Sequence, residues 1–174
     1  AFYSSEPLLS TAVNIGVKLR DYDEDVILKA LVLSLNSSLT ILQLLGFLVE
    51  TRGDFVDLHG ELVWSHVHIP DIRERSICKT LSKTFDEVSK WIAERELPSL
   101  FERLRAGDEL QKTIDEAVLK AAGLDGHVSV DELQAAVYQE LEMLRKVFES
   151  TMKLAKPRMR KRGQKAMRTL EKFF

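Results

Sequence analysis

The feature that most constrains the fold is the apolar stretch Val26–Val49, in which Lys29 is the only charged residue. Its length suffices for a membrane-spanning helix, which needs roughly 20 apolar residues. However, the polar Asn36–Ser38 lies near its middle, where it would face hydrocarbon unless partners were supplied. The charged residues on either side of the stretch also do not indicate which end of a spanning helix would face which side of a membrane. We therefore expect no membrane span.

Two arrangements inside a folded protein remain, one continuous buried helix or two helices that meet at Leu35–Ser38. Short polar side chains hydrogen-bond locally and cap a new helix, so we predict two helices. Both would be apolar almost all round, which requires burial on more than one side. Either the rest of the chain or another subunit must cover them.

The composition is that of a folded protein with an uneven charge distribution. The chain has 174 residues, of which 45% are hydrophobic and 30% charged. Residues 21–69 carry eight acids against two basic residues, whereas residues 145–174 carry eleven Lys and Arg against two acids. The two regions can attract one another or bind different partners.

The cysteine content and the start of the chain bear on location. Cys78 is the only cysteine, which excludes an intrachain disulfide and favours a reducing compartment. Residues 1–25 lack a signal-peptide layout, because Glu6 and the acidic run at 21–25 interrupt any apolar core. We expect a cytoplasmic protein.

The only β signal follows the apolar stretch. Residues 54–58 and 61–65 flank His59-Gly60, which is the spacing of a two-residue hairpin turn. A short amphipathic helix after Ser4–Pro7 and the two helices of the apolar stretch precede it. The second of these helices is predicted to end at Thr51–Gly53.

This order of three helices and a hairpin over residues 4–69 resembles the layout of a winged-helix domain. The resemblance implies that the third helix, Leu39–Val49, would read DNA, yet it contains no basic residue. DNA binding depends on Lys and Arg that neutralise phosphates. A winged helix of this composition would contact protein instead.

Three helices are predicted after the hairpin. The first, between Pro70 and Pro98, has an amphipathic core stripe. A short helix follows from Ser99 to Leu104, and Asp108 caps a third that stops at Gly123. The inward residues are Ile77, Leu81, Phe85, Val88 and Trp91 or Ile92 in the first, and Leu110, Ile114, Val118 and Leu119 in the third.

A long helix begins after Ser129, where Ser129 and Glu132 form a capping box. Its apolar residues approximate a heptad seam of the kind that pairs helices. Pro157 ends it. We predict that the seam is an oligomer interface, made by Leu133, Val137, Leu141, Leu144 and Phe148, with Met152 or Ala155 beyond them.

The C-terminal segment is densely basic. No acid interrupts residues 156–168, so the segment could bind nucleic-acid phosphates, an anionic membrane or an acidic protein surface, or be solvated. We name it as the candidate nucleic-acid-binding site. Its basic residues are Lys156, Arg158, Arg160, Lys161, Arg162, Lys165 and Arg168.

A metal site is a weaker prediction. His66 and His68 share one face if residues 61–69 are a strand, and Asp57 lies on the same face. With Asp57 or Cys78 as a third ligand they could bind a transition metal. No CxxC or HExxH spacing is present, so a solvated hairpin face is the favoured explanation of these histidines.

The sequence thus predicts a mainly α protein, a helical bundle with one short β-hairpin and a long C-terminal helix. The expected units are a winged-helix-like module at 1–69, a helical bundle at 70–156 and a basic amphipathic helix at 157–174. No phosphate loop or nucleophile turn is visible, and no cofactor is expected.

We expect a non-enzymatic interaction or regulatory subunit of a larger assembly that forms homo-oligomers or binds a protein partner, with nucleic acid as a further partner. The alternatives are a sequence-nonspecific DNA- or RNA-binding protein and a metal protein or enzyme centred on the histidines.

Overall fold

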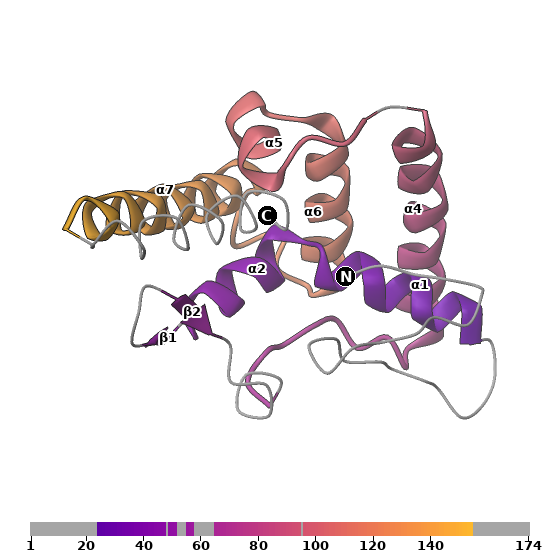
Figure 1. The fold of residues 1–174 in the computed structure, drawn as a ribbon. Coiled ribbons are helices and arrows are strands. Elements are labelled where there is room, and N and C mark those ends of the chain that lie inside the picture. The colour runs from indigo at the N-terminus through magenta and orange to yellow at the C-terminus, as the bar shows by residue number, and fades with distance from the viewer. Residues whose placement is uncertain (1–23, 48, 52–54, 58–64, 95, 155–174) are drawn as a thin grey trace.

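A computed structural model describes residues 24–47, 49–51, 55–57, 65–94 and 96–154 of the chain. Within these ranges the protein is mainly helical, as predicted (Figure 1). Its elements are α1 (Glu24–Leu35), α2 (Ser38–Leu45), β1 (Val49–Thr51), β2 (Phe55–Asp57), α4 (Arg75–Ala93), α5 (Leu100–Ala106), α6 (Glu109–Ala121) and α7 (Val130–Leu154).

The apolar stretch folds as two helices, which confirms the prediction. Helices α1 and α2 are bent by 57° at the break between them. Ser37 is the N-cap of α2, and its side chain accepts a hydrogen bond from the backbone N–H of Thr40. The predicted C-terminal end was wrong: α2 ends at Leu45, and Thr51 belongs to a strand. Gly46 follows the helix directly as its C-cap, and its backbone is in the right-handed helical region.

The strand pairing differs from the predicted hairpin. Strand β2 pairs antiparallel with β1, with Glu50 opposite Val56, whereas the sequence paired it with residues 61–65 across His59-Gly60. Among the described residues its partner is thus the preceding strand. Residues 58–64, and the first helix of the winged-helix layout within 1–23, lie outside the described ranges. The predicted hairpin and that layout are not supported.

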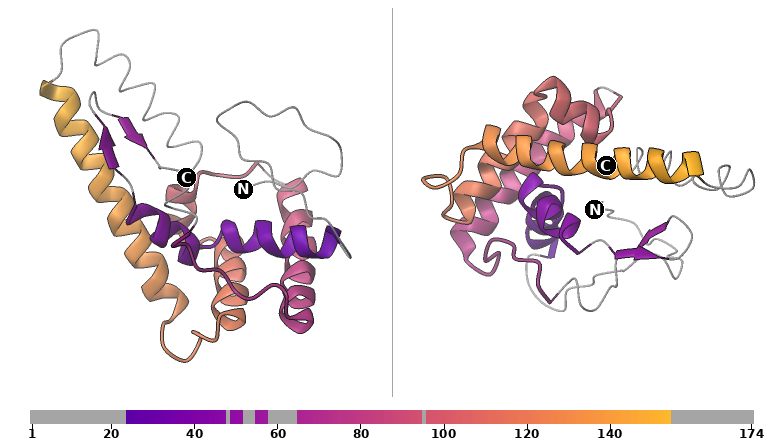
Figure 2. Two further views of the ribbon diagram at one scale, coloured as in Figure 1. Left: turned by 90° about the horizontal axis from the view of Figure 1, so that it is seen from below. Right: turned by 90° about the vertical axis from the view of Figure 1, so that its left-hand side faces the viewer.

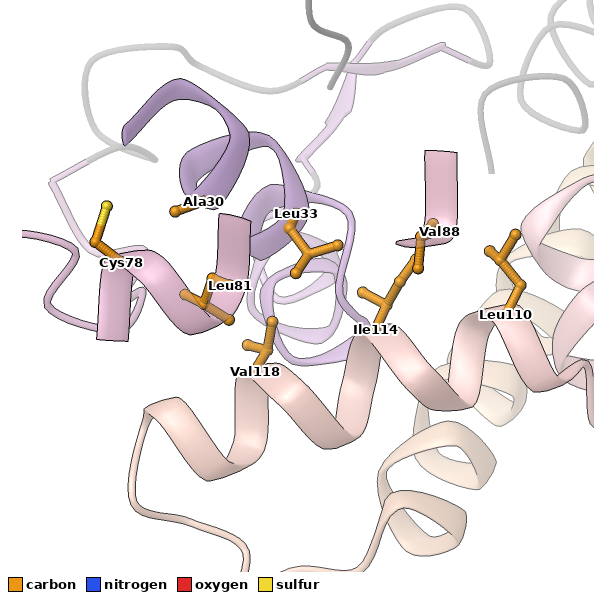
Figure 3. Packing of buried hydrophobic residues seen from close by; sticks show 8 residues of the cluster. All are labelled: Ala30, Leu33, Cys78, Leu81, Val88, Leu110, Ile114 and Val118. Carbon is orange, nitrogen blue, oxygen red and sulfur yellow. The ribbon is translucent and has the colours of Figure 1, made fainter. Parts of the chain in front are cut away.

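The first core cluster joins α1, α4 and α6. Leu33, Leu81 and Val118 are almost fully buried in it, and their side chains converge between the three helices (Figure 3). Burial of each aliphatic side chain stabilises the fold by roughly 1.5–3 kcal/mol. The four inward residues predicted for α6 are all buried, which confirms its amphipathic pattern.

The same layer neutralises the only charge of the apolar stretch. Lys29 Nζ lies 2.8 Å from an Asp25 carboxylate oxygen and 3.0 Å from one of Asp86 on α4. Hydrogen bonds to these two acids raise the pKa of Lys29, against a smaller opposing effect of burial. The lysine therefore ties α1 to α4 at the edge of the core.

The predicted core stripe of α4 is too long. Ile77 and Phe85 pack against the cluster, and Leu81 and Val88 are buried, but Trp91 and Ile92 are 42% and 39% exposed. Val88 is the last buried residue of α4. The final turn of α4 lies outside the packed layer, and periodicity alone does not show where the packing partners end.

The second core cluster joins α2, α5 and α7. Ile41, Leu100, Val137 and Leu141 are buried together, and Phe101 stacks on Tyr138 with ring centroids 4.9 Å apart. From this cluster α7 extends away from α4 and α6 (Figure 2). The two clusters meet at α2, whose Leu39 packs against the first cluster and whose Ile41 belongs to the second.

The starts of α5, α6 and α7 are capped by residues of the local sequence. Asp108 caps α6, accepting a hydrogen bond from the backbone N–H of Leu110 at 2.8 Å. The predicted capping box before α7 is present, because Ser129 Oγ accepts from the Glu132 N–H while the Glu132 carboxylate accepts from the Ser129 N–H. An unpredicted capping box opens α5 at Ser99. These caps fix where the helices begin.

Candidate functional site

The predicted nucleic-acid site lies outside the described residues. All seven basic side chains, from Lys156 to Arg168, fall within the range 155–174, which the structure does not describe. Binding of nucleic acid by this segment stays a prediction. The last described residue before it is Leu154, the end of α7.

The predicted oligomer seam is packed within the chain itself. Val137 and Leu141 contact the cluster formed with α2 and α5; Leu133 and Phe148 are also buried, and Leu144 is half-buried. A second subunit is therefore not required to cover these residues. Periodicity correctly identified a buried face of α7, but it could not distinguish an intrachain partner from another chain.

His66 and His68 lie on an exposed segment that is attached to α2. The backbone N–H of His68 donates to Gln43 Oε1 at 2.8 Å, and Gln43 Nε2 donates back to the His68 carbonyl at 2.9 Å. The ring of His66 lies 5.7 Å from that of Phe47. These contacts hold the segment 65–68 against the end of α2 and leave both imidazoles at the surface.

The described side chains do not form a metal-binding site. Within the residues searched, no group of three or more His, Cys, Asp and Glu side chains could hold a metal ion. The Asp57 side chain is not among those described, so the set His66, His68 and Asp57 remains a prediction. Cys78 lies in the first core cluster beside Ala30 (Figure 3), which is an apolar setting.

The most unusual described group is a buried carboxylate at the centre of the fold. Asp115 on α6 is fully buried and receives donors from both α2 and α7. Its Oδ1 accepts from the backbone N–H of Ser38 at 2.6 Å, and its Oδ2 accepts from Ser38 Oγ at 2.7 Å. Gln134 Nε2 donates to Oδ2 at 2.7 Å, and Gln111 Nε2 donates to Oδ1 at 3.2 Å. The carboxylate therefore joins three helices through four hydrogen bonds.

A second layer of polar contacts surrounds this carboxylate. Gln111 is itself buried, and its Oε1 accepts from Arg103 Nη1 on α5 at 2.7 Å. Gln111 thus links the negative charge of Asp115 to the positive charge of Arg103. Around the helix break, Ser34 Oγ donates to the Ala30 carbonyl at 2.8 Å. Buried polar groups are tolerated only when satisfied in this way.

Burial and hydrogen bonding act in opposite directions on Asp115. Burial raises the pKa of the Asp115 carboxyl and is the largest effect; the hydrogen bonds from Gln134, Ser38 and Gln111 lower that pKa. The net shift is upward. With four donors and no solvent access, the carboxyl is arranged to hold helices together rather than to meet a substrate.

Sequence reasoning did not identify this cluster, although a signal for it existed. The polar Asn36–Ser38 inside an apolar stretch required a partner. Gln111 and Asp115 each follow an inward residue of α6, Leu110 and Ile114 respectively, and are spaced by one helical turn. The polar residues beside the apolar face of α6 could have been proposed as partners of the polar residues between α1 and α2. Only the packing of α2 on α6 shows that they are in contact.

Two groups of apolar side chains are exposed on the described helices, one on α7 and one at the end of α4. On α7, Met143 and Val147 are 57% and 50% exposed and lie one turn apart. At the end of α4, Trp91 and Ile92 are exposed next to the connection to α5. Isolated exposed apolar residues are common, so spacing and the surrounding charge decide whether a group is a binding surface.

Comparisons with known proteins give no family for this chain. No protein-family model, curated protein or solved structure matches it. Among the described residues no single helix is long and apolar enough to cross a membrane, whereas the bent pair Asp25–Leu35 and Ser38–Leu45 passes that test of length and composition when taken together.

Proposed function

We propose that the protein is a non-enzymatic interaction or regulatory subunit of a larger assembly. The observation that carries this proposal is the exposed apolar pair Met143 and Val147 on the half of α7 that extends away from α4 and α6. A helix whose inner face is already packed gains nothing for its own fold from apolar residues on its outer face. Exposed apolar side chains that lie together on such a face are candidates for contact with a protein partner.

The charge distribution supports the same proposal. Strongly acidic and strongly basic regions occupy different parts of the chain, and complementary charge steers and orients protein association. The buried network around Asp115 supplies a rigid support, because it fixes α2 and α7 on α6. A rigid helix reduces the entropy cost of binding.

The native mass of the isolated protein tests this proposal. We expect the tagged chain, purified under native conditions, to run in a complex of fixed stoichiometry with a mass well above its own 19.8 kDa. Replacement of Met143 and Val147 by Glu is expected to release the chain as a folded monomer. A wild-type protein that stays at 19.8 kDa over its cellular concentration range would contradict the proposal.

A second candidate function is sequence-nonspecific nucleic-acid binding. It is favoured by the composition of residues 156–168, where seven Lys and Arg occur without an acid. Phosphate contacts from such a segment give affinity without base specificity. The two functions are compatible, because this segment directly follows the described helix α7.

A further inference from the structure

One ridge of α4 is exposed along its whole length and carries three cations and a tryptophan. Residues four apart on a helix form a continuous ridge. All five residues of this ridge are exposed, and α4 lies at one edge of the described fold (Figure 1). The ridge spans about 24 Å at the rise of an α-helix. We call it the α4 ridge, and its residues are Arg75, Lys79, Lys83, Glu87 and Trp91.

The cations of the α4 ridge are accessible to an anionic ligand. Neither Arg75 nor Lys79 forms an ion pair with another described residue. Lys83 Nζ lies 3.7 Å from a Glu87 carboxylate oxygen, and the two side chains are 81% and 51% exposed. An exposed pair of this kind contributes little to stability, so another anion can take the place of Glu87. The first half of the ridge therefore presents three positive charges about one helical turn apart.

The apolar side of α4 is already used by the core. Ile77, Leu81 and Phe85 pack in the first cluster, so this helix has no long apolar face to insert into an anionic membrane. Protein interfaces are built on apolar and aromatic anchors and contain few lysines, whereas the exposed residues of α4 from Arg75 to Glu87 are all polar. Over this length the surface favours a ligand that is bound through charge.

A second copy of α4 is a poor partner for this ridge. Antiparallel pairing would bring the Lys83 and Glu87 side chains of the two copies together, but exposed ion pairs alone contribute little. Helices pair stably when apolar residues recur at alternating three- and four-residue steps. The residues with that spacing on the exposed side of α4 are all polar, namely Ser76, Thr80, Lys83, Glu87, Lys90 and Glu94.

Trp91 identifies a ligand that uses both features of the ridge. Its side chain is 42% exposed and lies two four-residue steps beyond Lys83. Proteins that bind single-stranded nucleic acid without sequence preference combine cations along the backbone with an aromatic ring on which a base stacks. In a duplex the bases are stacked on one another and do not reach such a ring. We infer that the α4 ridge binds single-stranded DNA or RNA, with its three cations on phosphates and Trp91 stacked on a base.

The inference goes beyond the proposed function, and Trp91 itself reports on the site. The chain contains two tryptophans, so Trp64→Phe leaves Trp91 as the only one in the full-length protein. We expect a short single-stranded oligothymidylate to quench the fluorescence of Trp91, because a base stacks on the indole ring. A duplex of the same length should not quench it, even where that duplex binds residues 156–168. Vesicles that contain an anionic lipid should not displace the oligothymidylate.

The phosphate contacts are tested by fluorescence anisotropy of a labelled oligothymidylate with the full-length chain. Arg75→Gln/Lys79→Gln should weaken binding and make the dependence of log affinity on log salt less steep by about 1.4, the value for two phosphates of a single strand. The control Arg105→Gln/Lys120→Gln removes the same charge from exposed positions outside α4. The control should leave the slope unchanged.

Single variants test the other two residues of the ridge. Trp91→Ala should weaken binding about fivefold or more, whereas Trp91→Phe should retain most of the affinity, since phenylalanine also stacks on bases. Ile92→Ala alters the exposed apolar neighbour and should bind as the wild type does. Glu87→Gln should strengthen binding, because it removes a negative charge from the ridge and releases Lys83.

Several outcomes would overturn the inference. These are an absence of quenching, equal quenching by single strand and duplex, equal loss in the double variant and its control, and weaker binding by Glu87→Gln. Displacement of the oligothymidylate by anionic vesicles would assign the ridge to a membrane surface instead. The mass of the native complex is measured independently, so the proposed function stands or fails separately from this inference.

Discussion

The backbone N–H of Ser38 donates to Oδ1 of Asp115 at 2.6 Å, although 77 residues separate the two in sequence. This bond connects the break in the apolar stretch to the middle of α6. The Ser38 hydroxyl donates to the other carboxylate oxygen at 2.7 Å, so one serine uses both oxygens of one aspartate. These two hydrogen bonds fix the start of α2 on α6.

Removal of the Asp115 carboxylate should strongly destabilise the fold. Asp115→Ala would leave the donors of Ser38, Gln111 and Gln134 buried without their acceptor, and a buried unsatisfied donor costs roughly 1–3 kcal/mol. We expect a loss of at least about 3 kcal/mol in the free energy of unfolding, measured by urea denaturation. Glu116→Ala changes the exposed neighbouring acid on α6 and serves as control, with a change within about 0.5 kcal/mol. Equal effects of the two variants would contradict this role.

The pH dependence of stability should have a defined sign at Asp115. Burial raises the pKa of Asp115 in the folded state above its value in the unfolded state. The shift therefore contributes to the free energy of unfolding when the pH is below the unfolded-state pKa. This contribution is lost as the pH rises through the folded-state pKa. Relative to the non-titrating Asp115→Asn, the wild type should therefore become more stable as pH falls from neutral to about pH 4. The measurement is the difference in unfolding free energy between the two proteins across that range. A difference that changes in the opposite direction would show that the four hydrogen bonds outweigh burial.

The basic segment should make nucleic-acid binding strongly salt-dependent. If it contacts about five phosphates of duplex DNA, log affinity should fall against log salt with a slope of about −4 to −5. Truncation after Ala155 should abolish binding while helical content from α1 to α7 is retained. Titration of labelled duplexes of unrelated sequence at several salt concentrations measures both effects. Equal binding by the truncated and full-length chains would assign the segment to a protein contact or a solvated surface.

The histidine prediction can be tested by metal titration. If His66 and His68 bind zinc with Asp57, zinc should raise the thermal midpoint of the metal-free protein. Histidine must be neutral to bind a metal, so the gain should fall below about pH 6. The double variant His66→Ala/His68→Ala should show no gain. His127→Ala alters a histidine in the α6–α7 connection and should respond as the wild type does; absence of any zinc effect on the wild type would end the hypothesis.

The sequence by itself determined where several helices lie and how they begin. The two helices of the apolar stretch, the cap at Asp108 and the capping box at Ser129 follow from short-range rules, in which a side chain satisfies amide groups within three residues of itself. The apolar rows of α6 and α7 follow from helical periodicity. These features need no knowledge of what lies opposite each helix.

Only the tertiary structure decided which faces meet and which remain open. Periodicity predicted a buried face on α7 and an oligomer interface along it. In the structure Val137 and Leu141 pack on α2 and α5 of the same chain. The predicted buried stripe of α4 wrongly included Trp91 and Ile92. Whether these side chains are buried depends on how far the opposing helices extend. The partner of Ser38 lies 77 residues away, and no local rule connects the two. A side chain's role beyond its own helix depends on distances that arise only when the helices pack.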